Sequence, residues 1–121
     1  MPSRRGLGWR HTIHAMHQRF THYLRRERRR IGLSQADVAA LLGGPWKGRV
    51  SWYEHGALPP TPTALEYEAI LGRPVSDLLG GAFQLAVYKV RQRARELLRR
   101  DVNPHTSRQL KRHHTLERIA A

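Results

Sequence analysis

The side chains of this sequence that could do chemistry are mainly cationic. Of its 121 residues, 22 are Lys or Arg and nine are Asp or Glu, which gives a formal net charge of +13. Three of the cations are lysines and the rest are arginines, whose forked guanidinium groups suit phosphates and nucleic-acid grooves. Such a large excess of one sign indicates a polyanionic partner. Solubility is the alternative explanation, but it rarely requires this much charge.

Histidine, cysteine and carboxylates are the residues from which a metal, redox or catalytic site would be built. The sequence has eight His and no Cys, which excludes disulfides, thiolate ligands and cysteine nucleophiles. His11, His14, His17 and His22 would spread over a wide arc of a helix, with no Cys or Asp nearby to complete a site. Paired carboxylates, a nucleophile elbow and a phosphate-binding glycine loop are also missing. We therefore predict no metal, no cofactor and no enzymatic activity.

The positive charge is concentrated at both ends of the sequence. Residues 1–32 hold nine Arg and one Glu, residues 33–80 have a net charge of −2, and residues 81–121 hold ten basic and three acidic side chains. Hydrophobic residues make up 40%, too many for a disordered basic tail. No apolar run reaches the roughly 18 residues of a membrane helix, and the first residues do not resemble a secretion signal. We expect a cytoplasmic, bacterial nucleoid-associated protein with no membrane contact.

The basic segments at both ends of the sequence show mainly helical periodicity. Residues 1–8 show no periodicity and predict a flexible basic arm, in which Arg4 and Arg5 are candidates to enter a minor groove. An apolar series then predicts a long helix from Trp9 to near Arg30. Its members are Trp9, Ile13, Met16, Phe20, Leu24 and Ile31. Sustained strand alternation is absent from the sequence, so the predicted fold class is all-α.

Caps and glycines predict the next two helices. Ser34 and Asp37 have the spacing of a capping box, and Gly43-Gly44-Pro45 ends the helix that they begin. The buried stripe of that helix is predicted to be Val38, Ala39, Leu41 and Leu42. A short helix is predicted over Lys47–Glu54, with Val50 and Tyr53 facing inward and Gly56 ending it.

The remaining sequence predicts further helices. Thr61 is the expected N-cap of a fourth helix that Gly72 ends, and residues 76–79 form a short fifth. A basic helix then carries an apolar stripe with heptad-like spacing. The stripe consists of Phe83, Val87, Val90, Ala94 and Leu97. After the break at Asn103-Pro104, residues 107–119 are a last helical candidate.

Two segments, LSQADVAALLG at 33–43 and VSWYEHG at 50–56, together resemble the phage-repressor-like (Xre-type) helix-turn-helix family. Ala39 is small enough for two helices to cross closely, and Gly43 permits the turn between them. Val50 follows Gly43 by seven residues rather than the family's six, so the turn holds one extra residue. The resemblance implies a five-helix, lambda-repressor-like domain over residues 9–81, with an extended N-terminal helix. Residues 82–121 would be an added basic helical extension.

The resemblance also implies a recognition helix, Lys47–Glu54, whose N-terminal residues meet base edges in the major groove. The groove-facing candidates are Trp46, Lys47, Gly48, Arg49, Ser51 and Trp52. Arg49 or Lys47 would bind a guanine, with Arg49 preferred for its forked geometry. Trp52 would contact a thymine methyl, or would pack beneath the following loop instead. For Trp46 the alternative to a groove contact is packing over the turn between the two helices.

Three further residues occupy family positions with implied roles. Gln35 matches the position that holds a phosphate at the start of the second helix, with a solvated side chain as the alternative. Arg28 and Glu54 match a structural ion pair that ties the first helix to the recognition helix. These roles come from the resemblance rather than from the spacing of the residues alone.

Taken together, these features predict a sequence-specific regulator of transcription that binds double-stranded DNA and needs no small-molecule ligand. The stripe from Phe83 to Leu97 is a candidate dimerisation face, because a homodimer would place two recognition helices on neighbouring half-sites. One alternative is an antitoxin with the same DNA-binding fold, whose partner surface would be that stripe. The other is a non-specific nucleoid or RNA-binding protein that uses its basic ends alone.

Overall fold

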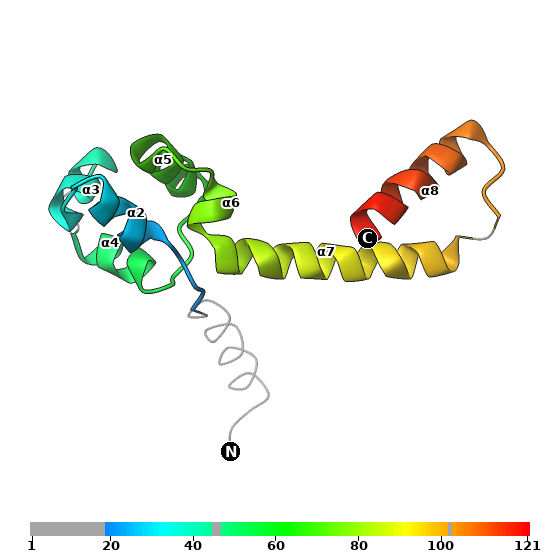
Figure 1. Cartoon of the computed structure of the whole chain (residues 1–121), viewed down its shortest axis with the longest axis horizontal. Coiled ribbons are helices and arrows are strands. Elements are labelled where there is room, and N and C mark those ends of the chain that lie inside the picture. The colour runs from blue at the N-terminus through cyan, green and yellow to red at the C-terminus, as the bar shows by residue number, and fades with distance from the viewer. Residues whose placement is uncertain (1–18, 45–46, 102) are drawn as a thin grey trace, which may run out of the picture. The chain divides into compact units, whose positions relative to one another are not determined.

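The computed structural model describes residues 19–44, 47–101 and 103–121, and all regular structure in these ranges is helical (Figure 1). The described helices are α2 (Leu24–Arg30), α3 (Gln35–Leu41), α4 (Lys47–Glu54), α5 (Thr61–Leu71), α6 (Val75–Leu78), α7 (Gly80–Arg100) and α8 (Ser107–Ala120). The predicted all-α class is therefore confirmed. The chain divides into two compact units, one ending at Ala82 and the other running from Phe83 to Ala121.

One apolar core joins helices α2 to α6 of the first unit. Its buried members come from all five helices and from residues that follow α4 and α6. They are Leu24, Val38, Ala39, Val50, Tyr53, Ala57, Ala64, Tyr67, Leu71, Leu78 and Leu79. The rings of Tyr53 and Tyr67 meet edge to face at a centroid distance of 6.2 Å, a favourable aromatic geometry. This core fixes α4, the predicted recognition helix, against its neighbours.

Helix α3 begins with the predicted capping box. The Ser34 hydroxyl accepts a hydrogen bond from the Asp37 backbone N–H at 3.0 Å, and the Asp37 carboxylate accepts one from the Ser34 N–H at 2.9 Å. Val38 and Ala39 are buried as predicted, but Leu41 is 57% exposed, so its predicted burial is wrong. Because successive helix positions turn by about 100°, the face that carries Val38, Ala39 and Leu42 directs position 41 outward.

The predicted long N-terminal helix is wrong over residues 19–23, which are not helical, since α2 begins at Leu24. The backbone of this segment bonds instead to distant parts of the unit. The N–H of Phe20 donates to the Gly56 oxygen at 3.0 Å, and the N–H of Tyr23 donates to the Leu78 oxygen at 2.9 Å. Tertiary hydrogen bonds thus replace helical ones. The earlier part of that predicted helix, and the predicted arm 1–8, lie outside the described residues.

The approach of this segment requires a glycine at position 56. Gly56 has φ +108°, and a Cβ there would lie 2.6 Å from the Phe20 oxygen. Gly56 therefore ends α4 as predicted, and its lack of a side chain also leaves room for the backbone of Phe20.

Helices α5 and α6 differ slightly from their predicted bounds. The N-cap of α5 is Pro60 rather than Thr61, and α6 begins at Val75 rather than Ser76. Gly72 ends α5 in a left-handed conformation with φ +71°, as predicted. Leu65 on α5 is 59% exposed, whereas Ala64, Tyr67 and Leu71 supply the buried face.

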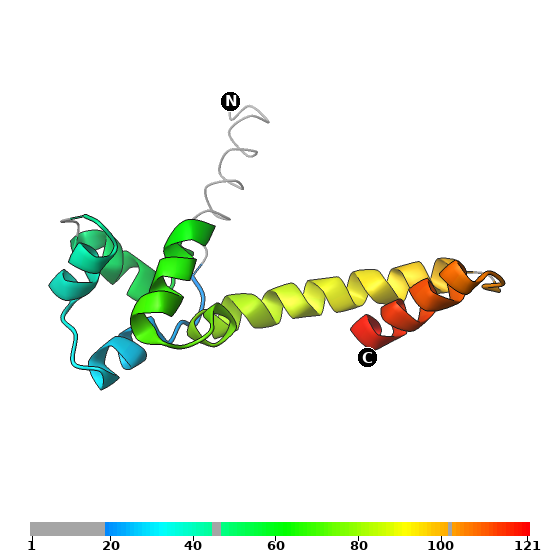
Figure 2. The same ribbon diagram turned by 90° about the horizontal axis from the view of Figure 1, so that it is seen from above.

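The second unit consists of α7 from Phe83 onward and α8, which turns back beside it (Figure 2). Among its described residues, the buried side chains are small, namely Ala94 and Ala120. The Arg95 Nε donates to the Ala120 oxygen at 3.1 Å and links the two helices. In the predicted apolar stripe of α7, Ala94 is buried, while Phe83, Val90 and Leu97 remain 49%, 47% and 38% exposed.

Candidate nucleic-acid interface

Helix α4 has the predicted bounds, Lys47–Glu54, and its inner face holds it firmly in the core. Val50 and Tyr53 are three positions apart, one helical turn, and are 0% and 2% exposed. The α3 helix that precedes it ends at a turn in which Gly43 has φ +91°. The N–H of Gly44 donates to the Ala39 oxygen at 3.1 Å, which closes the end of α3. The buried anchors and this turn leave the opposite face of α4 directed outward.

The outward face of α4 contains most of the predicted base-reading positions. Gly48 and Arg49 are exposed, Trp52 is 43% exposed, and Ser51 is half-buried. Lys47 is the first residue of α4. The other predicted DNA contacts, Trp46, Arg4 and Arg5, lie outside the described residues.

Two residues that sequence reasoning did not single out join this face. The Arg19 guanidinium lies 6.0 Å from the centroid of the Trp52 ring, within the range of a cation–π contact. The His55 Nδ1 lies 2.7 Å from the Ser51 backbone oxygen, one helical turn away. The spacing of Ser51 and His55 was readable as an i, i+4 pair. No feature of the neighbouring sequence predicted the contact between Arg19 and Trp52.

Arg28 and Glu54 form a largely buried ion pair between α2 and α4. The Arg28 Nε donates to Glu54 Oε2 at 2.5 Å, and Nη2 donates to Oε1 at 3.0 Å. A third donor, Arg28 Nη1, reaches the Leu33 oxygen at 2.9 Å. The two side chains are 10% and 1% exposed. The bidentate pair therefore joins α2 to the C-terminal end of α4.

The Gln35 side chain reaches the same carboxylate. Its Nε2 donates to Glu54 Oε1 at 3.1 Å, so the residue predicted to hold a phosphate is also part of the buried network. Burial by itself would raise the pKa of the Glu54 carboxyl, but the hydrogen bonds from Arg28 and Gln35 outweigh it and hold the pKa below its usual value. Glu54 is accordingly a charged, structural residue.

A second carboxylate, Glu27, pairs with arginines on and near α2. It is 6% exposed, and its Oε2 accepts from the Arg30 Nε at 2.6 Å. Arg26 and Arg73 approach the same carboxylate at 3.5 and 3.8 Å. The hydrogen bond from Arg30 lowers the pKa of Glu27. Part of the basic charge near the interface is thus used for internal pairing.

The described residues contain no group of three or more His, Cys, Asp or Glu placed to hold a metal ion. His22 lies 3.1 Å from the Ala57 oxygen through its Nε2. His11, His14 and His17 lie outside the described residues. None of the described helices combines the length and apolar character needed to cross a membrane.

Comparison with known proteins agrees with this geometry. Residues 19–69 match a family model described as a helix-turn-helix domain. Searches of curated proteins and of solved structures found no match. The matched region includes the Arg28–Glu54 pair, the turn after α3 and the whole of α4. A helix-turn-helix places its second helix in the major groove of DNA. Residues 19–69 are therefore similar to a helix-turn-helix domain, which is consistent with the family resemblance of the sequence.

Proposed function

We propose that this protein is a sequence-specific regulator of transcription that binds double-stranded DNA through α4. The observation that carries the proposal is the division of α4 into two faces. Val50, Tyr53 and Glu54 fix one face in the core, whereas Gly48, Arg49 and Trp52 face outward. A rigidly held helix with a cationic and aromatic outer face suits base readout in the major groove.

The proposed mechanism is occupancy of an operator or promoter site in the bacterial cytoplasm, without a catalytic step, cofactor or small-molecule effector. Arg49 would bind the two acceptors of a guanine through its guanidinium fork. Trp52 would pack on a thymine methyl, in a position supported by its contact with Arg19. The Gln35 amide retains capacity for a phosphate beside its bond to Glu54.

Selection of bound fragments from a random DNA library, followed by footprinting of the best site, tests this proposal. We expect one enriched sequence that binds about 10³-fold or more tightly than random DNA. A ratio near one would contradict sequence-specific regulation and would favour the nucleoid-structural or RNA-binding alternative. Competition with structured RNA then separates those two.

We also propose that the protein acts as a homodimer through the exposed apolar side chains of α7. Phe83, Val90 and Leu97 leave much of their apolar surface in water, and a second copy would cover it. Two recognition helices would then meet half-sites one DNA turn apart. Val90→Glu should shift sedimentation from dimer toward monomer, with the exposed polar change Gln92→Glu as control.

A monomer of 14.0 kDa at micromolar concentration, both free and on DNA, would contradict the homodimer. The antitoxin alternative uses the same exposed apolar side chains for a different protein. A neighbouring gene product that binds stoichiometrically, and whose binding Val90→Glu abolishes, would favour that alternative.

A further inference from the structure

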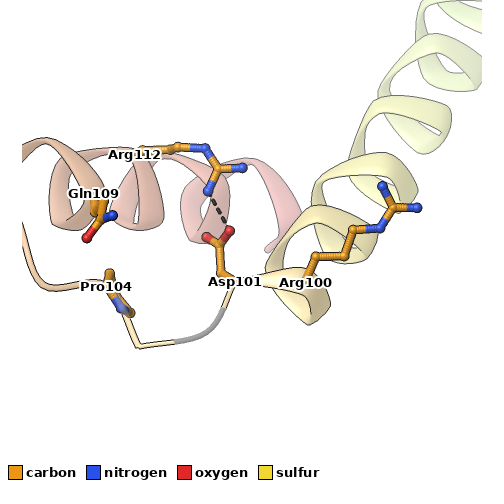
Figure 3. A pocket seen from close by; sticks show the side chains of 5 residues that line it. All are labelled: Arg100, Asp101, Pro104, Gln109 and Arg112. Carbon is orange, nitrogen blue, oxygen red and sulfur yellow. Dashed lines mark hydrogen bonds and ion pairs between the residues drawn. The ribbon is translucent and has the colours of Figure 1, made fainter.

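The acidic side chains of the second unit all lie beside Arg or His side chains. Asp101 accepts a hydrogen bond from the Arg112 Nη1 at 2.5 Å, and Arg100 turns away from that pair (Figure 3). Glu96 pairs with Arg99 and Arg100 near the end of α7. The Glu117 Oε1 lies 3.4 Å from the His113 Nε2. Because the acidic groups are used in this way, the remaining cations of the unit lack carboxylate partners among the described residues.

Three of these cations form one exposed row on α8. Arg108, Lys111 and Arg118 are exposed, and Thr115 lies between the last two. The spacing i, i+3, i+7 and i+10 places these four side chains on a single helical face. The other side of α8 carries the half-buried His113 and Leu116 and the buried Ala120.

Helix α7 carries a comparable row, but that row is interrupted by an acidic residue. Lys89, Arg93 and Arg100 share one face, and Glu96 falls within it. No carboxylate interrupts the row on α8. The charged side chains of this row on α8 are therefore all of one sign, because Glu117 lies on another face of the helix, and such a row attracts a polyanion more strongly than a row of alternating charge does.

We propose that the row Arg108, Lys111, Thr115 and Arg118 of α8 is a second DNA-binding surface, which contacts the phosphate backbone without reading sequence. The row is about 15 Å long at 1.5 Å per residue, and phosphates follow one another about every 3.4 Å of axis along each strand. Several phosphates thus lie within reach of its three cations. The inference rests on the proposed function only in taking duplex DNA as the partner.

The test measures binding of the full chain to a random-sequence 30-bp DNA duplex between 50 and 200 mM salt. Arg108, Lys111 and Arg118 are changed together to Gln, and the matched control changes Lys89, Arg93 and Arg100 to Gln. Both triple variants lose three charges at exposed positions, and circular dichroism checks that each remains helical. Because each phosphate contact contributes roughly 0.9 to the log–log salt slope, the α8 variant should lose about 2 to 3 of that slope. The α7 control should lose clearly less.

An equal loss in both variants would mean that total charge alone drives binding, and it would overturn the inference. So would an unchanged slope in the α8 variant, a wild-type chain that does not bind the duplex, or a loss seen only with a 30-bp RNA duplex. Failure of the proposed function is distinguishable from these outcomes. A chain without a preferred DNA sequence, but with the expected loss of slope in the α8 variant, would refute sequence-specific regulation and support this second surface.

Discussion

The interactions inside the first unit of this chain differ from those inside the second. The helix-turn-helix unit has a continuous apolar core and an ion pair in which Glu54 is 1% exposed. In the described part of the α7–α8 unit the buried side chains are the small Ala94 and Ala120, and the ion pairs are open to solvent. The Arg112 and Arg99 partners in those pairs are 49% and 70% exposed. Such open pairs contribute little to stability.

This difference shows that α3 and α4 lie in a weakly acidic segment, whereas the positive charge lies in the segments before and after it. Residues 33–80 have a net charge of −2, residues 1–32 carry +8 and residues 81–121 carry +7. On the proposals above, the rigid unit supplies base discrimination through the fixed orientation of α4. The basic unit supplies affinity that does not depend on sequence and is sensitive to salt.

The largest expected effect comes from breaking the buried ion pair. Glu54→Ala leaves the Arg28 guanidinium buried without its partner and also removes the acceptor of Gln35. We expect a loss of about 3 to 5 kcal/mol in the free energy of unfolding, measured by urea denaturation. Asp101→Ala, which removes the corresponding carboxylate of the second unit, should change that free energy little.

Glu66→Ala is the control within the first unit, because Glu66 is exposed on α5. Normal stability of Glu54→Ala would contradict the contrast between a buried pair in one unit and open pairs in the other.

A smaller loss of folding stability is expected when Gly56, which lies against the backbone of Phe20, is replaced. Gly56→Ala adds a Cβ 2.6 Å from the Phe20 oxygen at a backbone φ of +108°. Backbone strain alone costs about 1 to 3 kcal/mol, and displacement of the segment adds to it. Gly72→Ala is the matched control, since Gly72 has φ +71° but nothing within 4 Å of the added Cβ.

Chemical denaturation of both glycine variants should therefore rank Gly56→Ala as the less stable. The reverse ranking would mean that the segment's contact with Gly56 does not stabilise the unit.

An effect of similar size is expected on the free energy of DNA binding. It distinguishes base readout by α4 from the proposed phosphate contacts of α8. Arg49→Ala should cost about 1 to 3 kcal/mol on the selected site and relax discrimination at one base pair. Arg118→Gln should weaken the selected and the random duplex alike. Lys47→Ala, measured in parallel by fluorescence anisotropy, shows which of the two cations of α4 reads the base.

Full discrimination in both the Arg49 and Lys47 variants would remove base readout from the start of α4. Specificity would then come from Ser51, Trp52 or the shape of the DNA.

The smallest expected effect is a dependence of stability on pH in the helix-turn-helix unit. Burial lowers the pKa of the His22 ring, against the opposing effect of its hydrogen bond to Ala57. Its Nδ1 is buried without a partner among the described residues. The unfolded chain therefore binds the proton more readily than the folded chain does. The contribution of neutral His22 is fully present above about pH 6.5 and decreases as the pH falls below that value.

Thermal unfolding at pH 7.5 and at pH 5 measures this effect. His22→Gln should reduce the difference between the two melting temperatures, whereas His114→Gln, at a 77% exposed side chain of α8, should leave it unchanged. An unaltered difference in His22→Gln would show that other groups cause the acid sensitivity.

Much of the helical framework was predictable because it depends on neighbouring residues. The capping box of Ser34 and Asp37 and the bounds of α4 match the structure. The end of α5 at Gly72 does so as well. Each depends on contacts within about four positions or on the backbone freedom of one glycine. The positions of Arg28 and Glu54 were suggested by family resemblance, since 26 residues separate them.

The sequence by itself determined the all-α class, the bounds of α4 and the uneven distribution of charge. The tertiary structure alone decided that residues 19–23 bond to Gly56 and Leu78 instead of extending α2, and that Gln35 turns toward Glu54. It also decided that Leu41 and Leu65 face solvent although both are apolar. Apolar periodicity and capping residues reflect interactions within a single helix. The partner of a backbone N–H, or the side of a helix that meets the core, depends on groups brought close only when the chain folds.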